Sequence, residues 1–86
     1  MYSETVKVEN NINIYPNPII NEFLTVKFGM NKEIRYLIQL FDVAGNLIYS
    51  AKANESKDID FSYFPKGLYI LKITKGETTF NYKIIK

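Results

Sequence analysis

The sequence predicts an all-β domain, a seven-stranded immunoglobulin-like Greek-key β-sandwich. Short runs rich in β-branched and aromatic residues recur about every 10–12 residues, and turn residues separate them. No stretch of useful length places its apolar residues at the 3.6-residue spacing of a helix. Of the 86 residues, 47% are apolar and 15% are aromatic, which is typical of a folded chain rich in strands. A chain of this length forms one domain.

The first strand is expected near the start of the chain and at a sheet edge. Residues 1–11 are mostly polar and are interpreted as a linker or a loosely held first strand, so that the domain proper spans residues 12–86. Residues 11–15 alternate, and Pro16-Asn17-Pro18 then stops the strand because proline donates no backbone hydrogen bond. The asparagine between the prolines is expected to bond the local backbone.

The middle of the chain predicts three further strands. Residues 23–28 alternate, with apolar side chains on one face. Residues 36–41 are apolar at nearly every position of both faces, so this strand is expected to be central. A hairpin loop over residues 42–46, with Gly45 in a left-handed conformation, leads to a return strand over residues 47–51.

The facing of that return strand stays open at the level of the sequence. A β-bulge at Gly45 would turn Ile48 toward the core. A plain loop would instead turn Leu47 and Tyr49 inward. The alternation of the strand is compatible with both arrangements.

A corner is expected before the last two strands. Residues 58–61 alternate, with Ile59 and Phe61 inward, and Pro65-Lys66-Gly67 then ends the strand and turns the chain. The glycine of this motif suits a backbone that needs positive φ. Tyr69 follows two residues later, either as a tyrosine corner whose hydroxyl bonds backbone or simply as a core aromatic.

The last two strands form a predicted hairpin around Lys75-Gly76. A two-residue turn there brings apolar side chains of both strands to one face, because strand side chains alternate. The predicted pairs are Thr74 with Glu77, Ile73 with Thr78, Leu71 with Phe80, and Tyr69 with Tyr82. The opposite face is mostly polar, but Leu68, Ile70 and Ile85 are apolar exceptions on it.

The composition excludes several classes of function. A net charge of +2 is too small to indicate a nucleic-acid partner. The chain has no Cys and no His, so the commonest nucleophiles, acid–base groups and metal ligands are missing, and neither an enzyme nor a cofactor is predicted. No apolar run has the length of a transmembrane helix. The polar residues 1–4 do not resemble a signal peptide.

Some weaker features have two interpretations each. Asp58 and Asp60 share a strand face and could suggest paired carboxylates or a calcium site, but calcium needs about six to eight oxygens, so a solvated face is favoured. The sequence of residues 54–56 matches a glycosylation acceptor and is interpreted as a turn. Lys72 and Lys83 lie on the outer face of the last hairpin, either solvated or as part of a docking surface.

Four motifs together resemble a known family. They are Ile14-Tyr15-Pro16-Asn17-Pro18, Leu40-Phe41-Asp42-x-x-Gly45, Pro65-Lys66-Gly67-x-Tyr69 and Lys83-Ile84-Ile85-Lys86. In this order and spacing, over residues 12–86, they resemble the type A C-terminal sorting domain of type IX (Por) secretion in Bacteroidetes. Phe41 stands where the family often has Tyr, which is a conservative difference.

The resemblance implies a signal at the C-terminus of a larger cargo protein, which is secreted or held at the cell surface. The outer-membrane translocon would read the domain, and a sortase-like surface peptidase would cut in or before residues 1–11. The cargo would then be released or linked to an anionic lipopolysaccharide. The charges of Lys83 and Lys86 are expected to lie exposed on the surface that is read. The residues implied as the signal are Pro65, Gly67, Tyr69, Gly76, Lys83, Ile84, Ile85 and Lys86.

Two further possibilities accompany this interpretation. A carbohydrate-binding or adhesive module of a secreted protein would have a similar fold, and exposed tyrosines could hold a sugar in it. An exposed edge strand could also pair two copies of the domain as a homodimer.

Overall fold

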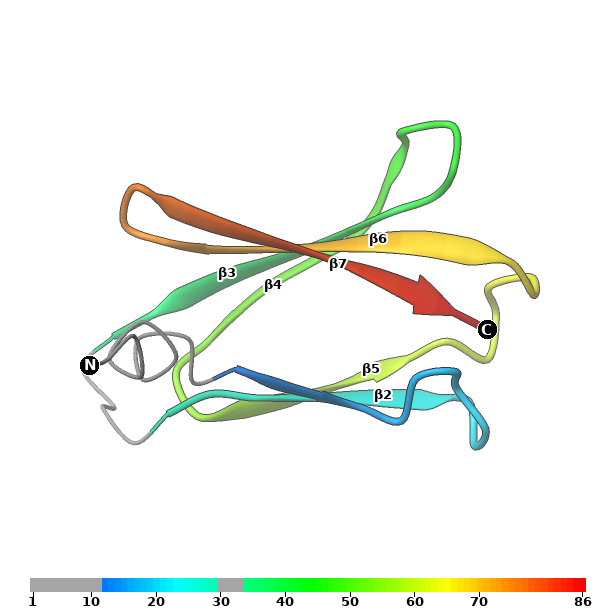
Figure 1. The fold of residues 1–86 in the computed structure, drawn as a ribbon, viewed down its shortest axis with the longest axis horizontal. Helices are drawn as coiled ribbons and strands as arrows, with labels where there is room; N and C mark the ends of the chain where they lie inside the picture. The colour runs from blue at the N-terminus through cyan, green and yellow to red at the C-terminus, as the bar shows by residue number, and fades with distance from the viewer. Residues whose placement is uncertain (1–11, 30–33) are drawn as a thin grey trace, which may run out of the picture.

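The computed structural model describes residues 12–29 and 34–86, which form seven strands in two antiparallel sheets. The strands are β1 (Asn13–Tyr15), β2 (Phe23–Lys27), β3 (Tyr36–Phe41), β4 (Leu47–Ala53), β5 (Ser56–Asp60), β6 (Leu68–Lys75) and β7 (Thr78–Ile85). The strand order is β1-β2-β5 in one sheet and β4-β3-β6-β7 in the other, and the sheets stack as two layers (Figure 1). The predicted β-sandwich is therefore confirmed. The expectation for residues 1–11 lies outside the described residues.

The connections explain the strand order. The pairs β1–β2, β3–β4 and β6–β7 are antiparallel neighbours within a sheet, whereas the chain changes sheet between β2 and β3, β4 and β5, and β5 and β6. As predicted, β1 is an edge strand, and β3 is central because it pairs with both β4 and β6. The break between Ala53 and Ser56 is the expected turn between two strands.

The core lies between the sheets and follows the alternation of the sequence. In β3 and β6 every second side chain is buried, and β2, β5 and β7 add one or two each. Full burial of one large aliphatic or aromatic side chain contributes about 1.5–3 kcal/mol. The buried residues are Leu24, Val26, Phe28, Tyr36, Ile38, Leu40, Ile59, Phe61, Tyr69, Leu71, Ile73 and Ile84.

A bulge decides the facing of β4, but not in either of the predicted ways. Leu40 pairs with Tyr49 while the next residue, Phe41, pairs with Leu47, so Ile48 is the extra residue on β4. Because of this insertion, Ile48 and Tyr49 both pack against the core, and Leu47 is 50% exposed. The bulge therefore lies inside the strand and not at Gly45, which has the expected positive φ of 88° in the loop.

The predicted register of the last hairpin is wrong by two residues. The structure pairs Lys75 with Thr78 and Leu71 with Tyr82, so the turn is at Gly76-Glu77. Gly76 has a φ of 60°, which suits the first central position of a turn that needs positive φ there. A shift of two residues preserves which side chains face inward, because the strand period is two. Ile84, on the same face of β7 as Tyr82, is accordingly buried.

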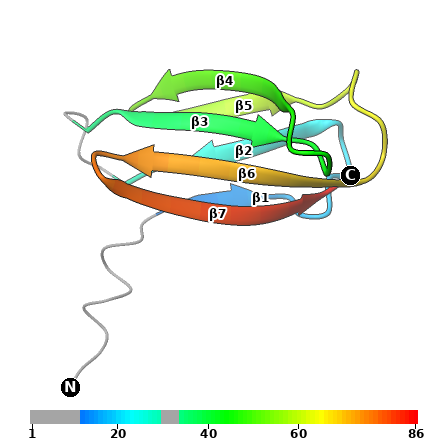
Figure 2. The ribbon, with the colours of Figure 1, turned by 90° about the horizontal axis from the view of Figure 1, so that it is seen from above.

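The strand directions gather several segments at one end of the sandwich, which we call the loop end. The β1–β2, β3–β4 and β5–β6 connections lie there, together with the last residues of β7 (Figures 1 and 2). The β6–β7 turn lies at the opposite end. Segments that are far apart in the sequence therefore meet at the loop end.

Candidate functional site

Tyr69 forms the centre of the corner at the start of β6. Its side chain is only 4% exposed, and its hydroxyl donates a hydrogen bond to the carbonyl oxygen of Pro65. Its ring meets that of Phe61 edge-to-face at 5.4 Å, and Phe61 in turn meets Phe64 at 5.3 Å. This is the tyrosine-corner arrangement, so the first of the two interpretations of Tyr69 is confirmed. Gly67, inside the corner, has a φ of 157°.

The environment of Tyr69 disfavours its ionised form. Burial raises the pKa of the Tyr69 hydroxyl, and the negative charge of Asp42 raises this pKa further. The hydroxyl therefore stays protonated and remains a hydrogen-bond donor to Pro65.

Asp42 organises the β3–β4 loop beside this corner. Its Oδ1 accepts hydrogen bonds from the backbone N–H groups of Ala44 (3.0 Å) and Asn46 (2.9 Å), and its Oδ2 accepts one from the Asn46 side chain (3.2 Å). The bond from the Asn46 backbone is the largest cause that lowers the pKa of Asp42. The carboxylate is therefore charged at neutral pH and fixes the shape of the loop.

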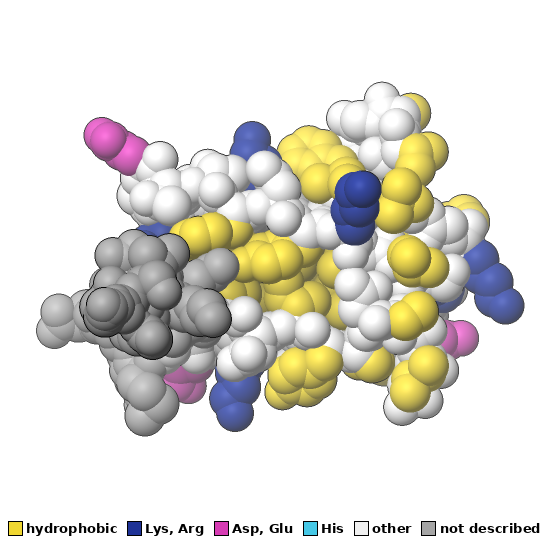
Figure 3. Space-filling model, in the orientation of Figure 1, with side chains coloured by type: hydrophobic (Ala, Val, Ile, Leu, Met, Phe, Trp, Pro, Cys, Tyr) yellow, Lys and Arg dark blue, Asp and Glu magenta, His cyan; other side chains and the backbone are white. Residues whose placement is uncertain are grey.

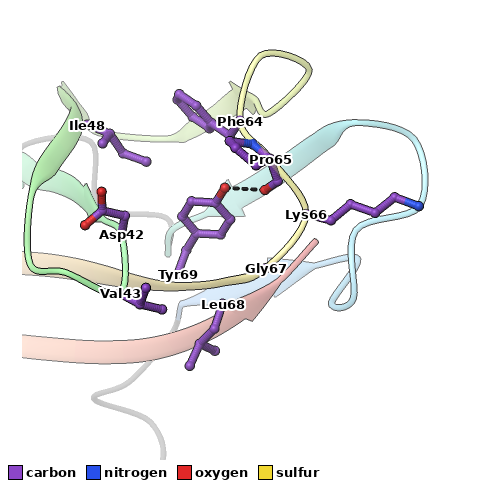
Figure 4. Close-up of a pocket in the computed structure, with 9 residues that line it drawn as sticks. All are labelled: Asp42, Val43, Ile48, Phe64, Pro65, Lys66, Gly67, Leu68 and Tyr69. Atoms are coloured by element: carbon purple, nitrogen blue, oxygen red, sulfur yellow. Dashed lines mark hydrogen bonds between the residues drawn. The ribbon is translucent and has the colours of Figure 1, made fainter.

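A surface pocket of about 270 Å³ separates the Asp42 loop from the corner. Figure 4 shows Asp42, Val43 and Ile48 on one side of Tyr69, with Phe64 and Pro65 on the other, while the Lys66 side chain extends away from the centre. Gly67 and Leu68 complete the lining, which is mostly apolar. Two of the four sequence motifs thus form one concave feature.

The first motif reaches the last strand through Asn17. Its Nδ2 donates to the Lys83 carbonyl (2.8 Å), and its Oδ1 accepts the Ile85 N–H (3.1 Å). The Ile19 N–H donates to the Ile85 carbonyl (2.8 Å). The expectation that Asn17 bonds local backbone is therefore wrong. The β1–β2 connection lies against the free edge of β7, and the Asn17 side-chain amide makes the two hydrogen bonds with β7 that a neighbouring strand would make there.

Lys86 connects the end of β7 to the corner and is not a solvated lysine. Its Nζ donates to the carbonyl oxygens of Phe61 and Phe64, at 2.7 Å each. Its backbone N–H donates to the Gly67 carbonyl (2.9 Å), and the Gly67 N–H donates to the Lys86 carbonyl (3.3 Å). The expectation of an exposed charge is wrong here, because the side chain folds back onto two carbonyls of the β5–β6 connection, which lie outside the strands.

A neighbouring carboxylate is affected by the same ammonium group. Hydrogen bonds from Ser62 lower the pKa of Asp60, and the positive charge of Lys86 lowers it further. Asp58 instead accepts a hydrogen bond from the Thr25 hydroxyl (2.8 Å). The two aspartates thus have separate partners, as expected for a solvated strand face. Among the described residues no group of three His, Cys, Asp or Glu side chains could hold a metal ion.

The structure brings seven of the eight predicted signal residues to the loop end. Three of them, Pro65, Lys83 and Ile85, are exposed. Tyr69 and Ile84 are buried, and Gly67 and Lys86 hold one another through backbone hydrogen bonds. The eighth, Gly76, lies in the β6–β7 turn at the opposite end of the molecule (Figure 1).

The sequence prediction missed two features of this end. One is the long-range role of Asn17, for which the Pro-Asn-Pro spacing was a visible but ambiguous sign. The other is the pair of carbonyls that bind Lys86, which belong to aromatic residues and leave no trace in the sequence pattern. No helix that could span a membrane occurs in residues 12–29 and 34–86.

The fold and site define a small immunoglobulin-like β-sandwich with its distinctive features at the loop end. The chain is similar to the crystal structure of a DUF3244 family protein with an immunoglobulin-like β-sandwich fold from Bacteroides vulgatus. The TM-score is 0.76, and the match covers 91% of this chain and 86% of that one. At 21% sequence identity, this likeness establishes the fold.

Residues 13–86 match the model of the secretion system C-terminal sorting domain family, and the chain belongs to that family. It is also 31% identical, over 81 residues, to an ulvan lyase, NLR42, from Nonlabens ulvanivorans. The match covers 87% of this chain but spans only 15% of the length of that protein. Domains of this family are the sorting signals of type IX secretion and mark proteins that are secreted or attached to the cell surface.

Proposed function

We propose that residues 12–86 direct a fused cargo protein across the outer membrane by type IX secretion. The observation that carries this proposal is the meeting of all four family motifs at the loop end. Asn17 of the first motif bonds the last strand, and the Lys86 backbone bonds Gly67 of the third motif. A rigid, composite surface of this kind suits recognition by a partner. The domain itself would do no catalysis, and any activity would belong to the cargo.

The relative supports an arrangement with a cargo. The segment of the ulvan lyase that matches this chain is a small share of a much longer protein. A domain of the present kind would therefore be one module behind a larger one. Removal of the domain by a sortase-like peptidase, and release or lipopolysaccharide linkage of the cargo, would follow export.

Seven of the eight signal residues would divide into two roles. The exposed side chains of Pro65, Lys83 and Ile85 are available to contact the translocon. Buried Tyr69 and Ile84, together with the bonded pair of Gly67 and Lys86, would instead hold those three in place. Gly76 would serve only the distant turn.

An export assay tests the proposal. Residues 12–86 are fused to the C-terminus of a periplasmic reporter that carries its own N-terminal signal, in bacteria with and without a working type IX system. We expect the reporter in the medium or on the surface only when the system works. As a control, the same fusion carries Leu71→Ala, which removes a fully buried side chain and should impair export through loss of the fold.

Two results would count against the proposal. The parent fusion could stay in the periplasm of cells whose type IX system exports its own substrates. Alternatively, the purified domain could bind glycans, as expected of a carbohydrate-binding or adhesive module, while the fusion is not exported.

A further inference from the structure

The four-stranded sheet has one face toward the core and one face away from the other sheet, which we call the outer face. Because side chains alternate along each strand, the register assigns the residues of this face. They are Leu37, Gln39 and Phe41 on β3, Leu47, Ser50 and Lys52 on β4, Leu68, Ile70, Lys72 and Thr74 on β6, and Thr79, Asn81, Lys83 and Ile85 on β7.

The half of the outer face near the loop end is apolar except for Lys83, which pairs with Ile70. Phe41 pairs with Leu47 on one side and with Ile70 on the other, and in the next row Leu68 pairs with Ile85. Leu47, Leu68 and Ile85 are 50%, 40% and 49% exposed. With Val43 of the adjoining loop, which is 75% exposed, these residues form what we call the apolar patch. Figure 3 shows hydrophobic side chains gathered at this end of the molecule.

The charges on the outer face have a single sign. Its strand positions include Lys52, Lys72 and Lys83 and no carboxylate. The carboxylate of Asp42, in the wall of the adjoining pocket, already accepts the backbone N–H groups of Ala44 and Asn46. The outer face of the three-stranded sheet differs, since Asp58 and Asp60 lie on it. A partner that complements the first face therefore carries negative charge beside apolar groups.

The pocket described above adjoins the apolar patch. Val43 and Leu68 belong to both, and Phe64 and Tyr69 add aromatic walls. Its volume of about 270 Å³ is large enough for a single protruding side chain. The cavity at the loop end therefore lies beside the apolar patch and the cations of the outer face.

We propose that the outer face is the docking surface for a protein partner that inserts one apolar side chain into the pocket. The partner covers the apolar patch with further apolar groups and places carboxylates opposite Lys72 and Lys83. This inference rests on the proposed function, and it names the chemistry of the surface by which the secretion machinery holds the domain.

Two other occupants fit the observations less well. A second copy docked face to face would oppose lysines to lysines, since the outer face has no carboxylate to pair with them. A membrane surface would cover the patch but has no side chain to fill the pocket. A protein that presents a protruding apolar side chain satisfies both features.

The test uses variants of the reporter fusion and of the purified domain. Leu47→Gln combined with Leu68→Gln removes two side chains of the patch. The matched control, Ile20→Gln with Phe23→Gln, removes two apolar side chains that are 75% and 49% exposed and lie outside the outer face. We expect the patch variant to be exported at least about tenfold more slowly and the control at the parental rate, because truncation at the centre of an interface weakens binding most.

A charge exchange tests the electrostatic part. Lys83→Glu changes an exposed cation on the outer face, and Lys27→Glu changes an exposed cation on the other sheet. We expect a larger loss of export rate from Lys83→Glu. Thermal unfolding of each purified domain verifies that all four variants are folded.

The outcomes separate this inference from the proposed function. Failure of the parent fusion to be exported refutes the proposed function. Parental export together with equal rates for the patch and control variants refutes the docking surface alone. The docking proposal also fails if the purified parent, but not the patch variant, binds anionic phosphatidylglycerol vesicles or dimerises in light scattering.

Discussion

Lys83 and Lys86 lie three residues apart in one sequence motif but have different environments. The Lys83 side chain points outward from β7, whereas the Lys86 ammonium group donates to two backbone carbonyls of the β5–β6 connection. Hydrogen bonds that involve a charged group contribute about 1.5–3 kcal/mol. The recognition role that the sequence suggested for both lysines therefore suits Lys83, whereas Lys86 holds the end of β7 against the corner.

The first prediction compares these two residues. Lys86→Met keeps an unbranched side chain, shorter by one atom, but removes its donor, so we expect the free energy of unfolding to fall by about 1.5–3 kcal/mol. Lys83→Met should change it by no more than about 0.5 kcal/mol. Urea unfolding of the purified domain measures both values. Equal stabilities of the two variants would mean that the Lys86 contacts do not stabilise the domain.

The second prediction concerns the pH dependence that Tyr69 confers. Its pKa is raised in the folded state, so above the ordinary tyrosine value of 10.0 the unfolded chain loses its proton first. Stability is therefore fully present below that pH and falls as the pH rises through the folded-state pKa.

Tyr69→Phe should lower stability at neutral pH, because the hydrogen bond to Pro65 is lost, and should also make the alkaline decline shallower. Tyr49, whose pKa is likewise raised by burial, keeps part of the decline in this variant. Unfolding between pH 8 and about pH 11 provides the measurement. An alkaline decline as steep as in the parent would exclude Tyr69 as its source.

At the scale of the element, the β6–β7 hairpin shows how a turn sets register without changing faces. Gly76 occupies a position that requires positive φ, which moves the turn by one residue and the pairing by two. The inward residues of β7 stay inward, because two residues are one full period of a strand. The predicted inward face of the hairpin is therefore correct, although the predicted pairing is wrong.

The third prediction tests this facing on β6. Leu71 is fully buried and Leu68 is 40% exposed on the outer face. Leu71→Ala should cost about 2–5 kcal/mol, as expected for a large-to-small change in a core. Leu68→Ala should cost clearly less, because much of its surface already contacts water. Thermal and urea unfolding measure which substitution lowers the stability more. A greater loss of stability from Leu68→Ala would mean that the two faces of β6 have been assigned the wrong way round.

At the scale of the whole molecule, the β1–β2 connection links the two sheets across their open edge. β7 is an edge strand of the four-stranded sheet, and exposed edges tend to pair with other chains. Asn17 and Ile19 cover the part of this edge around Lys83 and Ile85. A homodimer through this edge would have to use the part of β7 nearer the turn, and the expected edge-strand homodimer stays a prediction.

The fourth prediction follows from that link. Asn17→Ala removes the acceptor of the Ile85 N–H, so we expect hydrogen exchange at the Ile85 amide to become faster. The amides of β3, in the centre of its sheet, should keep their protection relative to the global stability. NMR measures the exchange of the Ile85 amide and of the β3 amides separately. Unchanged exchange at Ile85 would show that the Asn17 contact does not protect this edge.

The amino-acid sequence was sufficient to predict the fold class, the strands and the inward faces of the strands other than β3 and β4. Alternation with a period of two is a local property, and the burial of Ile59, Phe61 and Leu71 follows from it wherever the strands pair. The tyrosine corner could also be predicted, because its hydrogen bond joins Pro65 and Tyr69, which are only four positions apart. The motifs of the family were sufficient to identify it, since they stand at fixed places in the chain.

Only the tertiary structure decided which of these residues meet. The Asn17 amide bonds a strand that lies 66 to 68 positions further along the chain, and Lys86 bonds carbonyls 22 and 25 positions before it. Such contacts depend on how the sheets are stacked. Because every residue type has the same backbone carbonyl, the sequence does not indicate which carbonyls will accept these hydrogen bonds. The bulge at Ile48 was decided in the same way, because packing both Ile48 and Tyr49 against the core outweighs a regular ladder.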